Sequence, residues 1–263
     1  MPSIRLITAR SSLLGSALLG AAGILWSGPV HAQNGVGLDD DLFSGLTYRH
    51  IGPVGNRVSA VVGVPGDANA YYIGGASGGI FKTEDGGVLW TPIFDDQPAA
   101  SIGSLAIAPS DRNVVWAGTG ETFIRSNVSI GNGVYRSTDG GDTWTHKGLE
   151  STGRIGRIAI HPTDPDVVYV AALGHLYGPQ EERGVYRTKD GGDTWERVLF
   201  VDENSGAVDL VMDPNNPRIM FAATWQMLIR TWGRWSGGPG SGSYGSRDGG
   251  DSWERLEGNG LPQ

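Results

Sequence analysis

Four short segments of the chain alternate apolar and polar residues with the two-residue period of a β-strand. They are residues 57–64, 102–109, 155–162 and 207–214, which read RVSAVVGV, IGSLAIAP, IGRIAIHP and AVDLVMDP. Alternation of this kind predicts strands that bury one face. No part of the sequence sustains a 3.6-residue apolar period, so the pattern predicts an all-β chain.

A turn and a second strand follow each segment at a fixed spacing. The turn begins at a proline, and an aromatic residue stands seven positions further on in every unit. These aromatic residues are Tyr72, Trp116, Tyr169 and Phe221. Because the proline and the aromatic residue recur with the same spacing in four units, the chain contains an internal repeat. A repeat of this kind is stronger evidence for the fold class than any single motif.

The most regular part of the repeat is an Asp-Gly-Gly turn followed by a tryptophan. It reads KTEDGGVLW, RSTDGGDTW, RTKDGGDTW and GSRDGGDSW, and successive aspartates are 54, 51 and 58 residues apart. The recurring pairs are Asp85 with Trp90, Asp139 with Trp144, Asp190 with Trp195, and Asp248 with Trp253. Each unit then holds four strands, and this period suits a β-propeller built of four-stranded antiparallel blades.

We assign these aspartates a structural role. The carboxylate can accept hydrogen bonds from amides of its own turn, the glycines supply positive φ, and the indole is large enough to pack between sheets. A catalytic or metal-binding residue has no need to recur four times, and the Glu ligand of a calcium loop is missing at the required spacing. We therefore expect no metal site and no cofactor.

The motif Ser/Thr-x-Asp-x-Gly-x-Thr-Trp at this spacing resembles the Asp-box, or BNR, repeat. From Tyr48 to Leu256 the chain is similar to the propellers of sortilin-type proteins and of glycosyl hydrolases related to xyloglucanases, and it looks like an N-terminal fragment of such proteins. It lacks the cysteines of sortilins and the Phe/Tyr-Arg-Ile-Pro motif of sialidases. The resemblance implies either an exported module that binds a protein, peptide or glycan, or a glycoside hydrolase acting on polysaccharide. Those hydrolases place two carboxylates between two propellers, so four blades favour the binding module.

The first residues predict export. Arg5 and Arg10, an apolar run from Ser11 to Trp26 and a small-x-small site ending at Ala32 predict a signal peptide over residues 1–32. A retained N-terminal membrane anchor is the alternative. A linker over residues 33–47 would precede a propeller over residues 48–263, with blades at about 57–98, 101–150, 154–200 and 206–257. We expect the chain in the periplasm or outside the cell.

The composition of the chain mainly excludes some classes of binding partner. The formal net charge is −8, with 28 acidic and 20 basic residues. Nucleic acids and anionic membranes attract basic surfaces, so neither is an expected partner. After residue 32 no stretch has the roughly 20 apolar residues that span a bilayer. The chain has no cysteine, and its length is sufficient to bury a core without disulfides.

The variable parts of the repeat define a candidate binding face. In a blade of four antiparallel strands, the second turn and the link to the next blade lie on the face opposite the first and third turns. The second turn carries insertions in units two to four, at residues 120–132, 174–183 and 225–243. Insertions of this kind commonly form one binding face.

This face supplies the candidate site residues. The ligand-binding candidates are basic or aromatic: Arg125, Arg154, His175, Tyr177, Arg183, Arg230, Trp232, Arg234 and Trp235. The catalytic candidates are the carboxylates Asp95, Asp96 and Glu121, since glycosidases need two carboxyl groups about 5 to 9.5 Å apart. Each of these residues also has a structural interpretation. In general they are solvated charges on loops. Glu121 and Arg125 would form a local salt bridge, and Trp232 and Trp235 would cap the hydrophobic end of the propeller channel.

The number of units also bears on completeness. Four blades rarely close a ring, so the sequence predicts an incomplete propeller. The first and last blades would then expose apolar flanks, which implies either further blades downstream or self-association.

Overall fold

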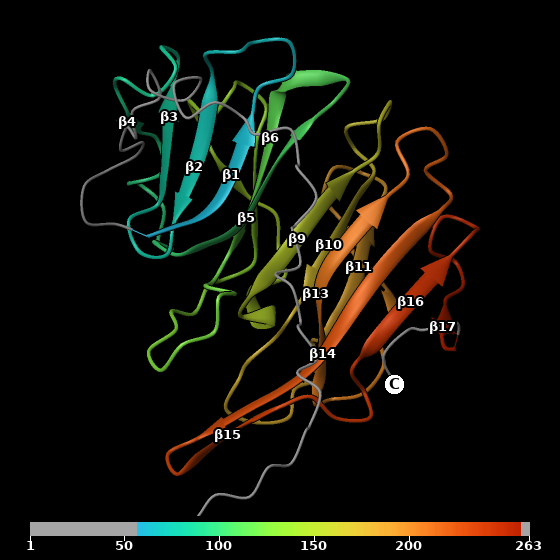
Figure 1. Ribbon diagram of the computed structural model, residues 1–263. Coiled ribbons are helices and arrows are strands. Elements are labelled where there is room, and N and C mark those ends of the chain that lie inside the picture. Colours follow the sequence, from blue (N-terminus) through green and yellow to red (C-terminus); the bar gives the residue numbers. More distant parts are fainter. Residues whose placement is uncertain (1–56, 259–263) are drawn as a thin grey trace, which may run out of the picture. The chain divides into compact units, whose positions relative to one another are not determined.

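The computed structural model describes residues 57–258, which form four antiparallel sheets (Figure 1). The first sheet contains β1 (Val58–Gly63), β2 (Tyr71–Gly75), β3 (Ile80–Thr83) and β4 (Thr91–Pro92). The second contains β5 (Ile102–Ala108), β6 (Asp111–Thr119), β7 (Val134–Ser137) and β8 (Thr145–His146). The third contains β9 (Ile155–Ile160), β10 (Val168–Ala172), β11 (Gly184–Thr188) and β12 (Glu196–Leu199). The fourth contains β13 (Ser205–Met212), β14 (Met220–Arg230), β16 (Gly242–Ser246) and β17 (Glu254–Leu256), with β15 (Gly233–Ser236) paired to β14.

Each sheet is one propeller blade, numbered here from blade 1 to blade 4 along the chain. The first strands of successive blades are neighbours, because β1 contacts β5, β5 contacts β9, and β9 contacts β13. Within residues 57–258 the series begins at β1 and ends at β13 without closing into a ring (Figure 1). Helix in these residues is limited to the 3₁₀ turn Glu150–Thr152. The prediction of an all-β, incomplete propeller of four-stranded blades is confirmed.

The Asp-box turns have the hydrogen bonds that the motif predicts. Asp139 Oδ1 accepts from the Ser137 hydroxyl at 2.7 Å and from the Thr143 amide at 2.9 Å, and Asp139 Oδ2 accepts from the Thr143 hydroxyl at 2.5 Å. These donors lower the pKa of Asp139 from 3.8 to about 2, and the Thr143 hydroxyl makes the largest contribution to this shift. Gly140 and Gly141 have φ of 72° and 94°, a region that favours glycine. Asp190 and Asp248 repeat this geometry, while Asp85 keeps the bonds from the Thr83 hydroxyl and the Leu89 amide but has no second hydroxyl donor, because Leu89 stands in place of Thr143.

Aromatic residues fill the space between blades. Trp144 of blade 2 packs with Phe94 and Tyr135, and its indole Nε1 donates to the Ile93 carbonyl of blade 1 at 2.8 Å. Trp195 of blade 3 donates in the same way to the Lys147 carbonyl of blade 2 at 2.6 Å. In blades 2 and 3 the box indole therefore ties its blade to the residue that follows the outer strand of the blade before it.

The insertion in blade 4 differs from the expectation of a loop. Residues 225–236 extend β14 and add β15 as a β-hairpin, with Ile229 opposite Arg234 and Arg230 opposite Gly233. The hairpin turn consists of Thr231 and Trp232, and two-residue turns of this kind direct two strands to pair. The insertion of blade 4 therefore continues the sheet as a paired hairpin instead of forming a loop.

The predicted signal peptide, residues 1–32, and linker, residues 33–47, lie outside the described residues. Between residues 57 and 258 no helix is long and apolar enough to cross a membrane. The same stretch holds no group of three or more His, Cys, Asp or Glu side chains that could hold a metal ion.

Candidate ligand-binding site

The variable insertions and the Asp-box turns leave each blade at opposite ends. In blade 2, β6 pairs with β7 so that Gly118 is opposite Val134 and Val115 is opposite Ser137. Residues 120–132 join the Gly118 end, whereas Asp139 follows Ser137 at the other end. The same antiparallel order in blades 3 and 4 gives residues 174–183 and 225–243 this placement.

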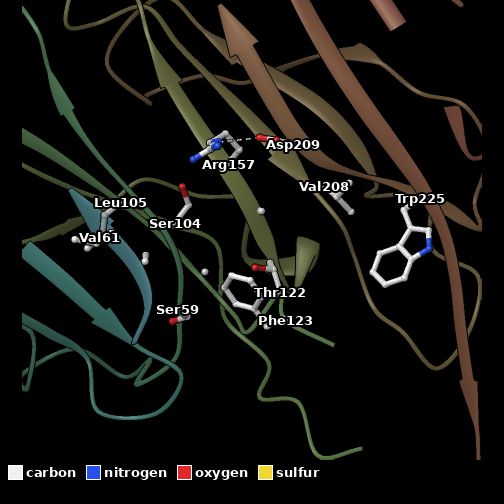
Figure 2. Close-up of a pocket in the computed structure, with 13 residues that line it drawn as sticks. Ser59, Val61, Ser104, Leu105, Thr122, Phe123, Arg157, Val208, Asp209 and Trp225 are labelled. Carbon is white, nitrogen blue, oxygen red and sulfur yellow. Dashed lines mark hydrogen bonds and ion pairs between the residues drawn. The ribbon is translucent and has the colours of Figure 1, made fainter. Parts of the chain in front are cut away.

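A depression of about 500 Å³ lies over the first strands of all four blades (Figure 2). Each of these strands has a β-bulge where it lines the depression, and the ladder shifts by one residue there. The residues at the four bulges are Ser59 with Ala60, Gly103 with Ser104, Gly156 with Arg157, and Val208 with Asp209. Bulges re-aim side chains and are common beside functional sites.

Polar side chains at these bulges tie neighbouring blades together. The Ser59 hydroxyl donates to the Ile102 carbonyl at 2.5 Å, which joins blades 1 and 2. Ser104 Oγ accepts from the Ile158 amide at 3.1 Å, which joins blades 2 and 3. Blade 3 is then joined to blade 4 through Arg157. The strands under the depression are therefore held together by polar contacts from blade to blade.

Arg157 and Asp209 form the one ion pair among the residues that line the depression. Arg157 Nε lies 2.8 Å from Asp209 Oδ1, and both side chains are about half exposed (Figure 2). Gly156 allows this approach, because a Cβ there would lie 2.4 Å from the Val208 carbonyl oxygen. The pair presents both a donor and an acceptor to solvent beside the bulges.

Two aromatic rings border the same depression. Phe123 comes from the blade 2 insertion and its side chain is 65% exposed, while Trp225 stands on β14 at the start of the blade 4 insertion. The Trp225 indole donates to the Ser236 hydroxyl at 3.1 Å, which fixes its orientation. In Figure 2 Phe123 and Trp225 lie on the same side of the Arg157 and Asp209 pair.

Glu121 is a buried anchor for the insertion of blade 2. Its carboxylate is fully buried and pairs with Arg57 of the segment before β1 and with Arg125 Nε at 2.8 Å. Burial raises its pKa, but the bonds from Arg125 and the Ser129 amide and the charge of Arg57 outweigh that effect and hold the pKa of Glu121 below its usual value. This arrangement matches the salt-bridge alternative and keeps Glu121 ionised.

Arg154 and Arg183 are buried at the insertion end of blade 3, and Arg154 interacts electrostatically with Glu121. Arg183 donates to the carbonyl oxygens of Leu173, Asn204 and Gly178 at 3.1 to 3.2 Å and to that of His175. Arg154 makes longer bonds, 3.4 Å to the Gly174 carbonyl and 3.5 Å to the Val128 carbonyl. Burial, together with these two cations, lowers the pKa of His175.

The remaining basic and aromatic candidates gather on the hairpin of blade 4. Trp232 is 80% exposed at its turn, and Trp235 and Arg234 on β15 are exposed as well. Arg230 donates to the Tyr177 carbonyl at 3.0 Å, which connects the hairpin to the blade 3 insertion. These side chains form an exposed surface on the hairpin, and none of them is among the residues that line the depression.

Asp95 and Asp96 lie apart from Glu121. They are exposed on the link from β4 to β5 and border a separate groove with Asp142, Thr143 and Trp144 of the second Asp-box. The structure therefore does not bring the three predicted carboxylates together.

Sequence reasoning missed Phe123, Trp225, Arg157 and Asp209. Arg157 and Asp209 interrupt otherwise apolar strands at equivalent positions, as their partners Ala171 and Ala223 on the second strands show. A charged residue at the same place in two successive inner strands is a signal that an alignment of the four units could have found.

The chain is similar in sequence to sortilin and to xyloglucanases. The family model for sortilin, neurotensin receptor 3, matches residues 132–260. A xyloglucanase from Paenibacillus sp is 26% identical over 213 residues, which cover 73% of this chain and 20% of the relative. A probable oligoxyloglucan-reducing end-specific xyloglucanase from Neosartorya fischeri is 29% identical over 151 residues, covering 54% of this chain and 17% of the relative. The chain thus spans about a fifth of the length of these curated relatives.

Solved structures agree in fold. An ancestral GH74 enzyme matches with a TM-score of 0.59 and 20% identity, over 76% of this chain and 25% of that one. The GH74 xyloglucanase from Xanthomonas campestris matches with a TM-score of 0.58 and 21% identity, over 80% of this chain and 31% of that one. At this identity the likeness concerns the blades and their arrangement.

Proposed function

We propose that this chain, an Asp-box propeller of the sortilin-like and xyloglucanase-like group, is a glycan-binding module. The ligand would lie in the depression over the four bulges, with sugar faces against Phe123 and Trp225. Its hydroxyl groups would bond with the Arg157 and Asp209 pair.

The depression itself carries this proposal. Ligand sites are concave and combine apolar rings with a few fixed polar groups. Here the rings come from two insertions, and the polar groups stand on strands that hydrogen bonds join from blade to blade. A sugar ring offers apolar C–H faces and hydroxyl edges, which such a surface complements. The names of the relatives identify xyloglucanases, so a xyloglucan-type polysaccharide is the first ligand to test.

Hydrolysis is the second candidate, and the same relatives favour it. A glycosidase needs one carboxyl group that can donate a proton and a second about 5 to 9.5 Å away. Among residues 57–258, Asp209 is the carboxylate that lines the depression, and Arg157 engages it. Glu121 has a lowered pKa, and a general acid needs the opposite shift. Binding is therefore the function that the described residues support best.

Calorimetry with xyloglucan oligosaccharides tests the binding proposal. Trp225→Ala and Phe123→Ala should each weaken affinity at least about tenfold, since stacked aromatic rings carry much of the energy of such sites. Phe200→Ala is the matched control, because Phe200 is also exposed but packs against Arg197 on the outer strand of blade 3. Equal effects of all three substitutions, or no heat of binding for the full chain, would refute the site.

A reducing-sugar assay on the same oligosaccharides separates the two functions. The binding module should bind without releasing new reducing ends. Release that survives in Asp209→Asn would place the chemistry elsewhere, and release abolished by that substitution would favour the hydrolase.

We also propose export, which the predicted signal peptide supports. Mass spectrometry of the purified chain should find an N-terminus at Gln33. An intact Met1 on protein from an exporting host would favour the anchor alternative.

A further inference from the structure

The Arg157 and Asp209 pair keeps several hydrogen-bonding atoms free in the depression. Both donors to the carboxylate share Asp209 Oδ1, which accepts from Arg157 Nε at 2.8 Å and from the Leu210 amide at 2.9 Å. Within residues 57–258, Asp209 Oδ2 accepts no hydrogen bond, and Nη1 and Nη2 of Arg157 donate none. Because both side chains are about half exposed, a ligand can replace the water around these atoms.

A further free group belongs to Ser104, which lines the same depression (Figure 2). Its Oγ accepts from the amide of Ile158, the residue after Arg157, and its own proton has no acceptor in the described part of the chain. The Ser59 hydroxyl differs, because it already donates to the Ile102 carbonyl. The free groups are therefore those of the ion pair and of the serine on blade 2.

The charges of Arg157 and Asp209 cancel, and this favours an uncharged ligand. A carboxylate on the ligand would compete with Asp209 for Arg157 and would be repelled by Asp209, while an ammonium group would be repelled by Arg157. A hydroxyl group avoids both conflicts, because it can accept from the guanidinium or donate to the carboxylate without breaking the ion pair. Hydrogen bonds of this kind gain strength from the charged partner.

The free acceptor and the free donors are close together, because they belong to two side chains in direct contact. Two ligand hydroxyl groups that reach both side chains must then be neighbours, as they are on adjacent carbons of a sugar ring. Phe123 and Trp225 lie on the same side of the pair in Figure 2. A sugar ring stacked on these aromatic side chains would present its hydroxyl edge to the pair.

From these atoms we infer that the depression selects an uncharged sugar with two adjacent free hydroxyl groups, a class of ligand that rests on the proposed glycan-binding function. One hydroxyl group accepts from Arg157 and its neighbour donates to Asp209 Oδ2, while Ser104 supplies a third polar contact. Arg157 and Asp209 then determine specificity, because a site built to bond hydroxyl groups rejects ligands that lack them.

Calorimetry with three polysaccharides tests this class of ligand. The glucose units of the xyloglucan backbone keep free hydroxyl groups on two adjacent carbons. In laminarin, another glucose polymer, the linkage occupies the carbon between the free ring hydroxyl groups, so they are not adjacent. Polygalacturonate keeps the adjacent pair but adds a carboxylate to every unit. The unsubstituted chain should bind xyloglucan at least about tenfold more tightly than either of the others.

Substitutions separate the ion pair from the aromatic rings. Asp209→Asn removes the free carboxylate oxygen, and Arg157→Lys removes the planar set of donors, so each should reduce the preference for xyloglucan over laminarin to less than about threefold. Phe123→Ala should weaken the binding of both polymers and keep the preference. Glu257→Gln, which removes half of the exposed ion pair with Arg255, is the control and should change neither affinity.

The outcomes distinguish the class of sugar from the binding function itself. No binding of xyloglucan by the unsubstituted chain would refute the proposed function and the inference with it. Equal affinity for xyloglucan and laminarin, tighter binding of polygalacturonate, or a preference that survives in both Asp209→Asn and Arg157→Lys would overturn the inference alone. The comparison of the three polysaccharides needs no substitution, so it holds even where thermal melting shows that a variant is misfolded.

Discussion

Replacing Asp139 with alanine measures what an Asp-box turn contributes to the stability of the propeller. The substitution removes the acceptor of three hydrogen bonds, from the Ser137 hydroxyl, the Thr143 amide and the Thr143 hydroxyl. Water can reach the turn, because Asp139 is exposed and Ser137 is buried beneath it. The lost bonds are therefore only partly replaced by solvent.

The expected cost is about 1 to 3 kcal/mol of the free energy of unfolding, or up to about 1 kcal/mol for each bond. The pKa gives an independent figure. A fall from 3.8 to about 2 corresponds to about 2.5 kcal/mol before screening, and to about 1 kcal/mol once exposure of the carboxylate is allowed for. The two figures agree near the lower end of the range.

Urea denaturation at several pH values checks both the size and the origin of the effect. The folded state depresses the pKa of Asp139, so its contribution is present above pH 4 and disappears as the pH falls towards 2. The difference between the unsubstituted chain and Asp139→Ala should shrink over that window. Glu84→Ala, which removes one exposed ion pair with Lys82, is the control and should cost less than about 1 kcal/mol. An Asp139→Ala chain that kept its urea midpoint but lost ligand binding would refute the structural role.

Two further substitutions test buried charges on the insertion side of the blades. Glu121→Gln should lower the free energy of unfolding by about 1 to 3 kcal/mol, because it leaves two arginines without their carboxylate, and differential scanning calorimetry would detect the shift. Arg183→Met should cost about 2 to 4 kcal/mol, since four backbone carbonyl oxygens lose their donor, while a surface Arg234→Met control should leave the melting temperature unchanged.

The fold was predictable because each element is encoded locally and repeated four times. Alternation set the strands, prolines and the Asp-Gly-Gly turns set their ends, and the conformation of glycines such as Gly140 confirms the turn chemistry. The repeat also showed which ends of the blades carry the insertions. Pairing partners within a blade then follow from chain order alone.

The candidate site was less predictable, because it depends on burial and on register. Arg154 and Arg183 are of a residue type that often binds ligands. In the structure, however, both side chains are buried and donate to backbone carbonyl oxygens. Counted back from the prolines of the repeat, Ala60 aligns with Ser104, and the bulges in β1 and β5 lie directly before these two residues. One unpaired residue in each inner strand decides which side chains line the depression, and no pattern in the sequence marks that residue.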